Sequence, residues 1–350
     1  METVYIGNVP VGDGFPPVFV AEVGSFFNKD VDLALDFLNR TVAAGAPLFK
    51  TEILHDPDTV LGSVDLDCHY KHAGGEKIEN YRALIERKVL PLNDYRRLLS
   101  AANDMSIPVI ATVFEEYGID FLQDMGGAGI KISRNNLHHI PLLRKAAKSG
   151  LPVIIDTGDV YLSETSQAVE VLQDLGAGVI VNHHPGPNPA PAGIHNMRMI
   201  DTYKSMFHTP IGLACHYRGD EMLYVAVARG ANLLEKGVVD DPDREEVDLL
   251  SALPFSELEA VLAKVQRCWE SLGDGLLRVP KNRNLSIRTG MYARKHFKKG
   301  EKISLESVGF AWPPVGASPE YWDDIEGWSV KEDVAQGEPI KLTNLSADKE

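Results

Sequence analysis

The chain has 350 residues, of which 44% are hydrophobic and 24% are charged, and its formal net charge is −15. This composition is typical of a soluble globular protein and argues against a disordered chain or a membrane protein. The negative balance argues against nucleic acid as a partner, because phosphate backbones are bound by a basic face.

Cysteine content and the N-terminus indicate the compartment. Only Cys68, Cys215 and Cys268 occur, and no CxxC pair is present, so neither a disulfide framework nor a thiolate metal site is expected. The N-terminus lacks the basic start and apolar core of a signal peptide, and no stretch approaches 18 apolar residues. We therefore predict a cytoplasmic protein without a membrane partner.

From residue 17 onward, short apolar runs rich in β-branched residues alternate with segments of helical period. The predicted strands are Pro17–Glu22, Pro47–Thr51, Pro108–Thr112, Gly129–Ser133, Pro152–Thr157, Gly178–His183, Pro210–Cys215 and Ala231–Glu235. Helices predicted between them include Val31–Ala44, Ile140–Ser149, Glu164–Leu175 and Glu221–Arg229. Eight βα units favour an α/β fold closed into a (β/α)8 TIM barrel over residues 1–271. An open doubly wound sheet is the alternative, but no glycine-rich dinucleotide fingerprint follows the first strand.

Two segments interrupt this pattern. Residues 55–89 are long for a βα connection and suggest either a functional lid or a disordered insertion at the barrel mouth. Residues 272–285 contain Gly273, Gly275 and Pro280 and are predicted to be a linker.

The C-terminal part, 286–350, contains an internal sequence repeat, which we call the internal echo. Residues 293–305 and 330–342 align so that Gly300-Glu301 matches Gly337-Glu338 and Ile303 matches Ile340. Each unit is a turn plus a strand, too short to bury its apolar face alone, so the two are expected to form one small β-rich domain.

Active residues of a barrel lie where its strands end. Here those polar residues are Glu22, Lys50, Thr112, Lys131, Asp156, His183, His184 and His216. Two lysines at the mouth indicate an anion site, or else ion pairs with Glu22, Glu52 or Asp156. The histidines could converge on one metal, but successive residues of a strand face opposite sides, so only one of His183 and His184 can join His216.

The strand-end motifs resemble those of the sialic acid synthase family. These are Phe19-Val-Ala-Glu-Val-Gly24, Ala44-Gly-Ala-Pro-Leu-Phe-Lys50, Thr112-Val-Phe-Glu115, Lys131-Ile-Ser133, Gly212–His216 and 219–236. The C-terminal echo resembles the antifreeze-like (SAF) domain that follows the barrel in that family. Family members join phosphoenolpyruvate to an N-acyl amino-sugar aldehyde with a divalent metal, usually as dimers that exchange SAF domains.

The resemblance implies roles for individual residues. Glu22, Lys50 and Lys131 would be catalytic. The residues that would bind substrate are Thr112, Arg134, Asn136, Asp156, Phe27 and Trp312. The metal, Mn²⁺ or Mg²⁺, would be held by His216 with His183 or His184. The chain departs from the family at Gly237, where a metal histidine is expected, and at Trp312, where an arginine is expected to contact the acceptor.

These observations predict a synthase that condenses phosphoenolpyruvate with a sugar-type aldehyde of altered structure. A sugar lyase or aldolase that uses Lys50 or Lys131 as an amine nucleophile is one alternative. A ligand-binding protein that has lost catalysis is the other, suggested by Gly237 and Trp312 together.

Overall fold

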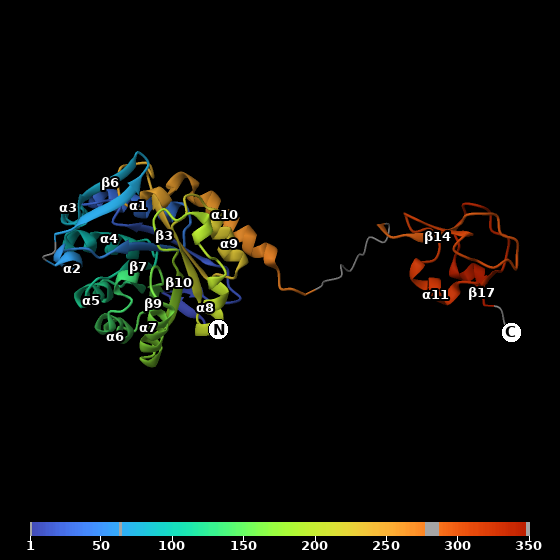
Figure 1. Ribbon diagram of the computed structural model, residues 1–350, viewed down its shortest axis with the longest axis horizontal. Coiled ribbons are helices and arrows are strands. Elements are labelled where there is room, and N and C mark those ends of the chain that lie inside the picture. The colour runs from blue at the N-terminus through green and yellow to red at the C-terminus, as the bar shows by residue number, and fades with distance from the viewer. Residues whose placement is uncertain (1, 63–64, 277–286, 348–350) are drawn as a thin grey trace. The chain divides into compact units, whose positions relative to one another are not determined.

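A computed structural model of the protein describes residues 2–62, 65–276 and 287–347 (Figure 1). The chain divides into two compact units, Met1–Asp274 and Gly275–Glu350. Of the linker predicted at 272–285, residues 277–285 lie outside the described part, and Leu272 is the last residue of a helix.

The first unit is a closed barrel of parallel strands surrounded by helices (Figure 1). Its strands are β3 (Val18–Gly24), β4 (Leu48–Glu52), β7 (Val109–Thr112), β8 (Gly129–Ile132), β9 (Val153–Asp156), β10 (Val179–His183), β11 (Ile211–Cys215) and β12 (Leu233–Val239). Each pairs with the next, and β12 pairs with β3 to close the ring. The predicted (β/α)8 barrel is confirmed, with strand ends shifted by a few residues.

The surrounding helices bury one apolar face each against the strands. They are α1 (Val31–Ala43), α4 (Leu92–Asp104), α5 (Glu116–Asp124), α6 (Ile140–Lys148), α7 (Leu162–Asp174), α8 (Met199–Phe207), α9 (Glu221–Ala228) and α10 (Phe255–Leu272). In α1 the Asp30 carboxylate accepts from the Leu33 N–H, and the buried face carries Phe37 and Leu38. This is the N-cap chemistry that lets a short helix begin at a defined residue.

A hairpin that the sequence analysis did not predict closes the N-terminal end of the barrel. Strands β1 (Val4–Ile6) and β2 (Val9–Val11) pair antiparallel. Ile6 and Val11 pack in one apolar cluster with inward residues of the barrel strands such as Leu48 and Ile154. This end of the barrel is therefore filled by hydrocarbon and contributes stability.

The insertion predicted at 55–89, of which residues 55–62 and 65–89 are described, lies at the other end of the barrel. It consists of α2 (Asp58–Leu61), the antiparallel hairpin β5 (Asp67–His72) and β6 (Gly75–Asn80), and α3 (Tyr81–Lys88). After β12 the chain forms the short strand β13 (Leu253–Pro254), parallel to β12. Short 3-10 helices in this unit are Arg134–Asn136, Ala192–Ile194 and Leu249–Ser251.

The second unit is a small β-rich domain with its own core. Its elements are β14 (Gly290–Ala293), β15 (Val308–Ala311), a 3-10 helix (Pro319–Tyr321), α11 (Trp322–Ile325), β16 (Ser329–Val330), a 3-10 helix (Leu342–Asn344) and β17 (Leu345–Ser346). Strand β14 pairs with β15 and β16 with β17, both antiparallel.

The internal echo is visible in the hydrogen bonds of this unit. Phe297 and Val334, which hold the same position in the two repeats, donate backbone N–H groups to each other's carbonyls at 2.8 and 3.0 Å. Ile303 and Ile340 are both buried in the shared core. Leu305, by contrast, is exposed. The repeats complete one core together, as the sequence predicts.

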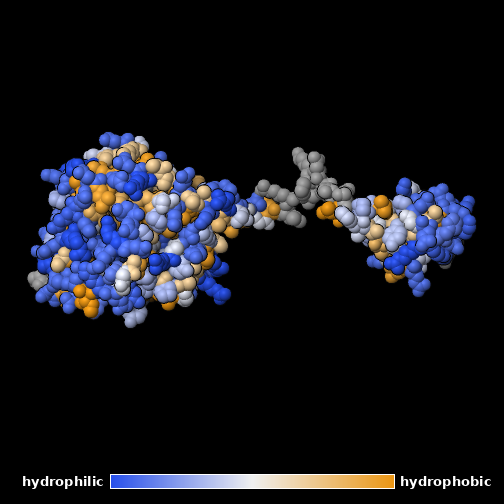
Figure 2. Space-filling view, turned by 90° about the horizontal axis from the view of Figure 1, so that it is seen from above, coloured by the Kyte–Doolittle hydropathy of each residue, from blue (hydrophilic) through white to orange (hydrophobic). Residues whose placement is uncertain are grey.

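The surface seen in Figure 2 is mostly hydrophilic on both units, with small hydrophobic patches between charged residues. None of the helices in the described residues combines the length and the apolar character needed to cross a bilayer.

Candidate functional site

A pocket of about 510 Å³ opens at the C-terminal end of the barrel strands. Two successive sets of inward positions form its floor and rim, because side chains on a barrel strand alternate between the interior and the helices. The inner ring consists of Glu22, Lys50, Thr112, Lys131, Asp156, Asn182, Ala214 and Glu235. The outer ring, two residues further along each strand, consists of Gly24, Glu52, Phe114, Ser133, Gly158, His184, His216 and Gly237.

The inner ring holds a buried network of charges. The Lys50 Nζ lies 2.9 Å from the Glu22 Oε1 and 3.4 Å from the Glu235 Oε1. The Lys131 Nζ lies 2.9 Å from the Asp156 Oδ1 and also contacts the other Glu235 oxygen. Lys50 and Lys131 are 3% and 1% exposed. Ion pairs with Glu22 and Asp156, one alternative that the sequence left open, are therefore present in the pocket.

The network also shifts the pKa values of its members. Burial opposes the charge on Lys50, but Glu22 and Glu235 outweigh it and raise the pKa of Lys50. Burial raises the pKa of Asp156 to about 6, although Lys131 opposes this shift. Burial also acts on Glu235, yet Lys131 and Lys50 hold its pKa well below the usual range. Asp156 is thus the carboxyl of this network that is most easily neutralised near physiological pH.

Glu235 is a central residue that the sequence analysis did not include among the site candidates. It contacts both lysines, and its Oε2 accepts a bond from the Asn182 Nδ2 at 3.0 Å. The sequence does indicate that Glu235 faces the barrel interior. Side chains alternate along a strand, and Leu233, two residues earlier, lies in the interior apolar cluster. The strand predicted at 231–235 ends at this residue, so the rule applied to the other strand ends would also have selected it.

The segment after β8 places Arg134 at the pocket and Asn136 away from it. The Arg134 Nη1 contacts Asp159 and donates to the Gly186 carbonyl at 2.9 Å. Asn135 lines the pocket, whereas Asn136 is not among its lining residues. Lys131, and not Arg134, therefore neutralises Asp156.

The structure separates the two adjacent histidines. His183 faces the helix layer, where its Nε2 contacts the His195 carbonyl and its ring lies against Tyr203. His184 faces the pocket, with its ring 4.4 Å from that of His216. Burial, followed by the nearby His216, lowers the pKa of His184, and burial lowers the pKa of His216 to about 4. Only His184 of the pair joins His216, and both rings are neutral at pH 7.

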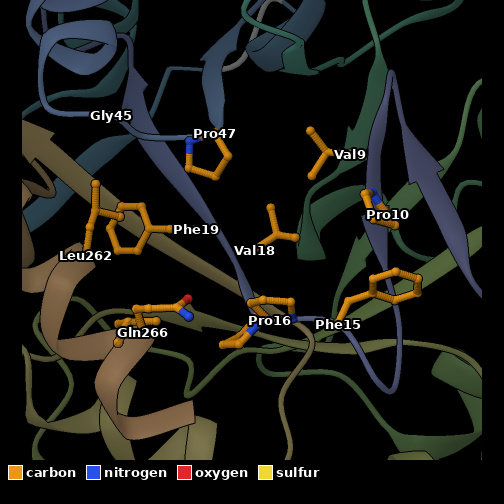
Figure 3. Close-up of a pocket in the computed structure, with 12 residues that line it drawn as sticks. Val9, Pro10, Phe15, Pro16, Val18, Phe19, Gly45, Pro47, Leu262 and Gln266 are labelled. Carbon is orange, nitrogen blue, oxygen red and sulfur yellow. The ribbon is translucent and has the colours of Figure 1, made fainter. Parts of the chain in front are cut away.

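A second pocket, of about 330 Å³, lies at the opposite end of the barrel (Figure 3). Phe15, Pro16, Phe19 and Pro47 line it with residues of β2 and of α10 such as Leu262. No residue of the inner or outer ring borders it. None of the residues that line this second pocket has a titratable side chain. Of the two pockets, the C-terminal one therefore holds the acidic, basic and imidazole groups.

Comparison with known proteins identifies the family to which this barrel and the C-terminal domain belong. Residues 38–276 match the NeuB family, and residues 288–346 match the SAF domain. The chain belongs to the NeuB family. The resemblance read from the strand-end motifs and from the C-terminal echo is thereby confirmed.

NeuB-family relatives align with nearly the whole chain. An uncharacterized protein of Methanocaldococcus jannaschii is 29% identical over 99% of this chain and 100% of its own length. The N,N'-diacetyllegionaminic acid synthase of Campylobacter jejuni is 25% identical over 93% of this chain and 98% of its own length. The crystal structure of the N-acetylneuraminic acid synthetase of Leptospira borgpetersenii, in complex with citrate, matches with a TM-score of 0.72 and 25% identity. The structural match covers 80% of the present chain and 93% of the Leptospira chain.

The divalent metal implied by the NeuB resemblance does not fit the residues present. Among the described residues, no three His, Cys, Asp or Glu side chains are gathered closely enough to hold a metal ion. The His216 Nδ1 is buried without a hydrogen-bond partner in the described part of the chain, but the His184 Nδ1 already accepts the Gly186 N–H at 3.0 Å.

An aromatic ring packs against the position of the missing histidine. A Cβ placed on Gly237 would lie 3.3 Å from Phe26 Cε2 and 3.3 Å from Ala252 Cβ. Phe26 is 6% exposed and lines the pocket. An imidazole at position 237 would therefore require Phe26 to shift, so the phenylalanine at 26 and the glycine at 237 depend on each other.

Of the other predicted substrate contacts, Phe27 is not at the pocket, and Trp312 lies in the second unit. Phe27 is buried in the barrel core and does not line the pocket, whereas its neighbour Phe26 does. Trp312 belongs to the SAF unit and is 65% exposed. Thr112 and Arg134 both line the pocket with the lysines.

Proposed function

We propose that this protein condenses phosphoenolpyruvate with an aldehyde of sugar type in the C-terminal pocket. The observation that supports this proposal is the pair of buried lysines, Lys50 and Lys131, facing one pocket in a NeuB-family barrel. Buried cations that face a cavity are suited to bind a phosphate and a carboxylate by charge-assisted hydrogen bonds.

The proposed reaction forms one carbon–carbon bond and exchanges the carbon–oxygen bond to phosphate for one to the oxygen of water. The enol carbon of phosphoenolpyruvate attacks the aldehyde carbon, water adds to the carbon that carries the phosphate ester, and inorganic phosphate leaves. The two protons of the water end on the aldehyde oxygen and on the phosphate. Lys50, Lys131 and Thr112 hold the phosphate and carboxylate. Glu22, paired with Lys50 at 2.9 Å, orients the attacking water and accepts its proton.

Binding of the donor requires a change in the charge network. In the structure, three carboxylates already neutralise the two lysines, and a phosphate must compete with them. Asp156 is the carboxylate that gives up its ion pair by taking a proton, because burial raises its pKa to about 6. A neutral Asp156 releases Lys131 to the anion, while Arg134 at the rim adds a second cation.

The charge network disfavours an amine nucleophile. Glu22 and Glu235 raise the pKa of Lys50, so its amine stays protonated at neutral pH. Because only an unprotonated amine attacks a carbonyl, we propose a synthase and not an aldolase that uses Lys50 as a Schiff base.

The proposal includes the assembly expected from the resemblance. We propose a homodimer in which SAF domains are exchanged, so that Trp312 of one chain contacts the acceptor bound to the other. Sedimentation equilibrium of the full chain tests the dimer. Deletion of 287–350 tests the exchange, because it is expected to raise the KM for the aldehyde more than that for phosphoenolpyruvate.

The test of the reaction is ³¹P-detected consumption of phosphoenolpyruvate by the purified full chain with a panel of amino-sugar and neutral-sugar aldehydes. We expect phosphate release that depends on one class of aldehyde and is lost in Lys131→Met. The matched control is Lys145→Met, since Lys145 lies on the outer helix α6 and pairs with Asp120. Absence of both turnover and phosphoenolpyruvate binding would overturn the synthase and favour a binding protein.

A further inference from the structure

The C-terminal pocket has two unlike walls. One carries the lysines and carboxylates of the inner ring. The other is built from side chains of a separate apolar cluster that also line the pocket: Leu54, Val60, Tyr70, Tyr81, Leu84 and Phe114. We call this set the apolar wall.

The apolar wall begins directly beside the charged ring. Phe114 comes two residues after Thr112, the last residue of β7, and both line the pocket. Leu54 likewise comes two residues after Glu52, the last residue of β4, and both line the pocket. A molecule held by the lysines would thus have its distal part against hydrocarbon.

Ion pairs hold the insertion that supplies this wall over the barrel mouth. The Arg87 guanidinium bonds to the Glu79 carboxylate at 2.8 and 3.0 Å and to the Glu246 carboxylate at 3.0 and 3.1 Å. Lys77 lies 2.9 Å from Glu245. Burial opposes the charge on Glu246, but hydrogen bonding by Arg87 outweighs it and lowers the pKa of Glu246, so the tie between the insertion and the segment after β12 persists at neutral pH.

The wall offers few groups to a polyhydroxylated ligand. The Tyr70 hydroxyl already donates to the Glu79 carboxylate at 2.8 Å. Leu54, Val60, Leu84 and Phe114 have no polar side-chain atom, so the Tyr81 hydroxyl is the one other polar side-chain group of the wall. Hydroxyls pressed against such a surface would lose their hydrogen bonds to water without replacement, whereas an apolar group would gain by leaving water.

From these contacts we infer that the acceptor carries an apolar substituent, aromatic or alkyl, that packs on the apolar wall while its aldehyde reaches the charged ring. This inference rests on the proposed condensation and specifies its acceptor. Phe114 and Tyr81 are then specificity-determining residues.

The turnover test compares two aldehydes that differ only in one group: N-phenylacetyl-D-mannosamine and N-acetyl-D-mannosamine, each with phosphoenolpyruvate. We expect kcat/KM to favour the phenylacetyl compound by about 10-fold to 100-fold, the range that a hydrophobic pocket discriminates. In Phe114→Ala and in Tyr81→Leu this ratio is expected to fall toward one. Tyr161→Ala is the control, because Tyr161 is 79% exposed and outside the pocket, and it should keep the ratio. A ratio of one or below in the wild type would overturn the inference while leaving the condensation established.

A binding test separates this inference from the proposed reaction. The alditols of the same two compounds lack the aldehyde and cannot react, and saturation-transfer NMR reports whether their acyl groups contact the protein. Transfer to the phenyl protons that is lost in Phe114→Ala and Tyr81→Leu supports the apolar wall even if no phosphoenolpyruvate is consumed. Equal, weak transfer to both alditols, unchanged in the variants, would overturn it. Melting temperatures of the variants show that they remain folded.

Discussion

The two ends of the barrel differ in chemistry although the same strands form both. At the N-terminal end Leu48 and Ile154 belong to an apolar layer closed by the hairpin β1–β2. Two positions further along the same strands, Lys50 and Asp156 face a pocket with their charges paired. The comparison shows that one end stabilises the fold and leaves the other free to carry buried charges that cost stability.

Removing one cation from the charged end should have the largest effect. Lys131→Met leaves Glu235 and Asp156 facing each other without their shared counterion, so we expect a loss of about 3–5 kcal/mol in the free energy of unfolding. Phosphate release should fall below detection. Urea unfolding and the ³¹P assay measure the two effects. Activity within a few-fold of the wild type would contradict the role of Lys131.

A truncation at the apolar end should affect stability alone. Leu48→Ala opens a cavity under the hairpin β1–β2 and is expected to cost about 2–5 kcal/mol. The KM for phosphoenolpyruvate should stay unchanged at a temperature where the variant is folded. A change in KM as large as that in Lys131 variants would show that the two ends are coupled.

Neutralising Asp156 should strengthen anion binding at the charged end. Since burial raises its pKa to about 6, the carboxyl loses its charge as the pH falls through that value, and affinity for phosphoenolpyruvate should rise. Asp156→Asn should be neutral at every pH and bind up to about 30-fold more tightly than the wild type at pH 7.5, as 1.5 pH units imply. Isothermal titration at pH 5.5 and 7.5 measures this. Comparison with the variant cancels the titration of the ligand itself. Identical pH profiles for the two proteins would refute the role of Asp156.

Metal should have the smallest effect. Among the described residues no three ligating side chains are gathered, and Phe26 packs against Gly237, so we expect no saturable Mn²⁺ binding by electron paramagnetic resonance and no loss of activity with a chelator. The double variant Phe26→Ala with Gly237→His should gain binding, because it restores both the ligand and its space. Stoichiometric binding by the wild type that disappears in His216→Ala would show that the site holds a metal after all.

Much of the candidate site could be predicted because the side of a strand on which a side chain lies depends only on its position within that strand. The positions of Lys50, Thr112 and Lys131 at strand ends were sufficient to place them in one barrel mouth, and the structure brings them to one pocket. The same alternation allowed only one of His183 and His184 to face His216. Asn136 and Phe27 lie in connections after the strands, where no period applies, and the structure places both away from the pocket.

The sequence by itself determined the eight strands, the SAF repeat and the residues that point inward, because each depends on spacing within a short segment. Only the tertiary structure decided which inward residues meet. Glu235 bridges two lysines from other strands, and Phe26 fills the space beside Gly237. Such pairings depend on barrel closure and on side-chain volume across the interior, neither of which is encoded in the spacing of any single segment.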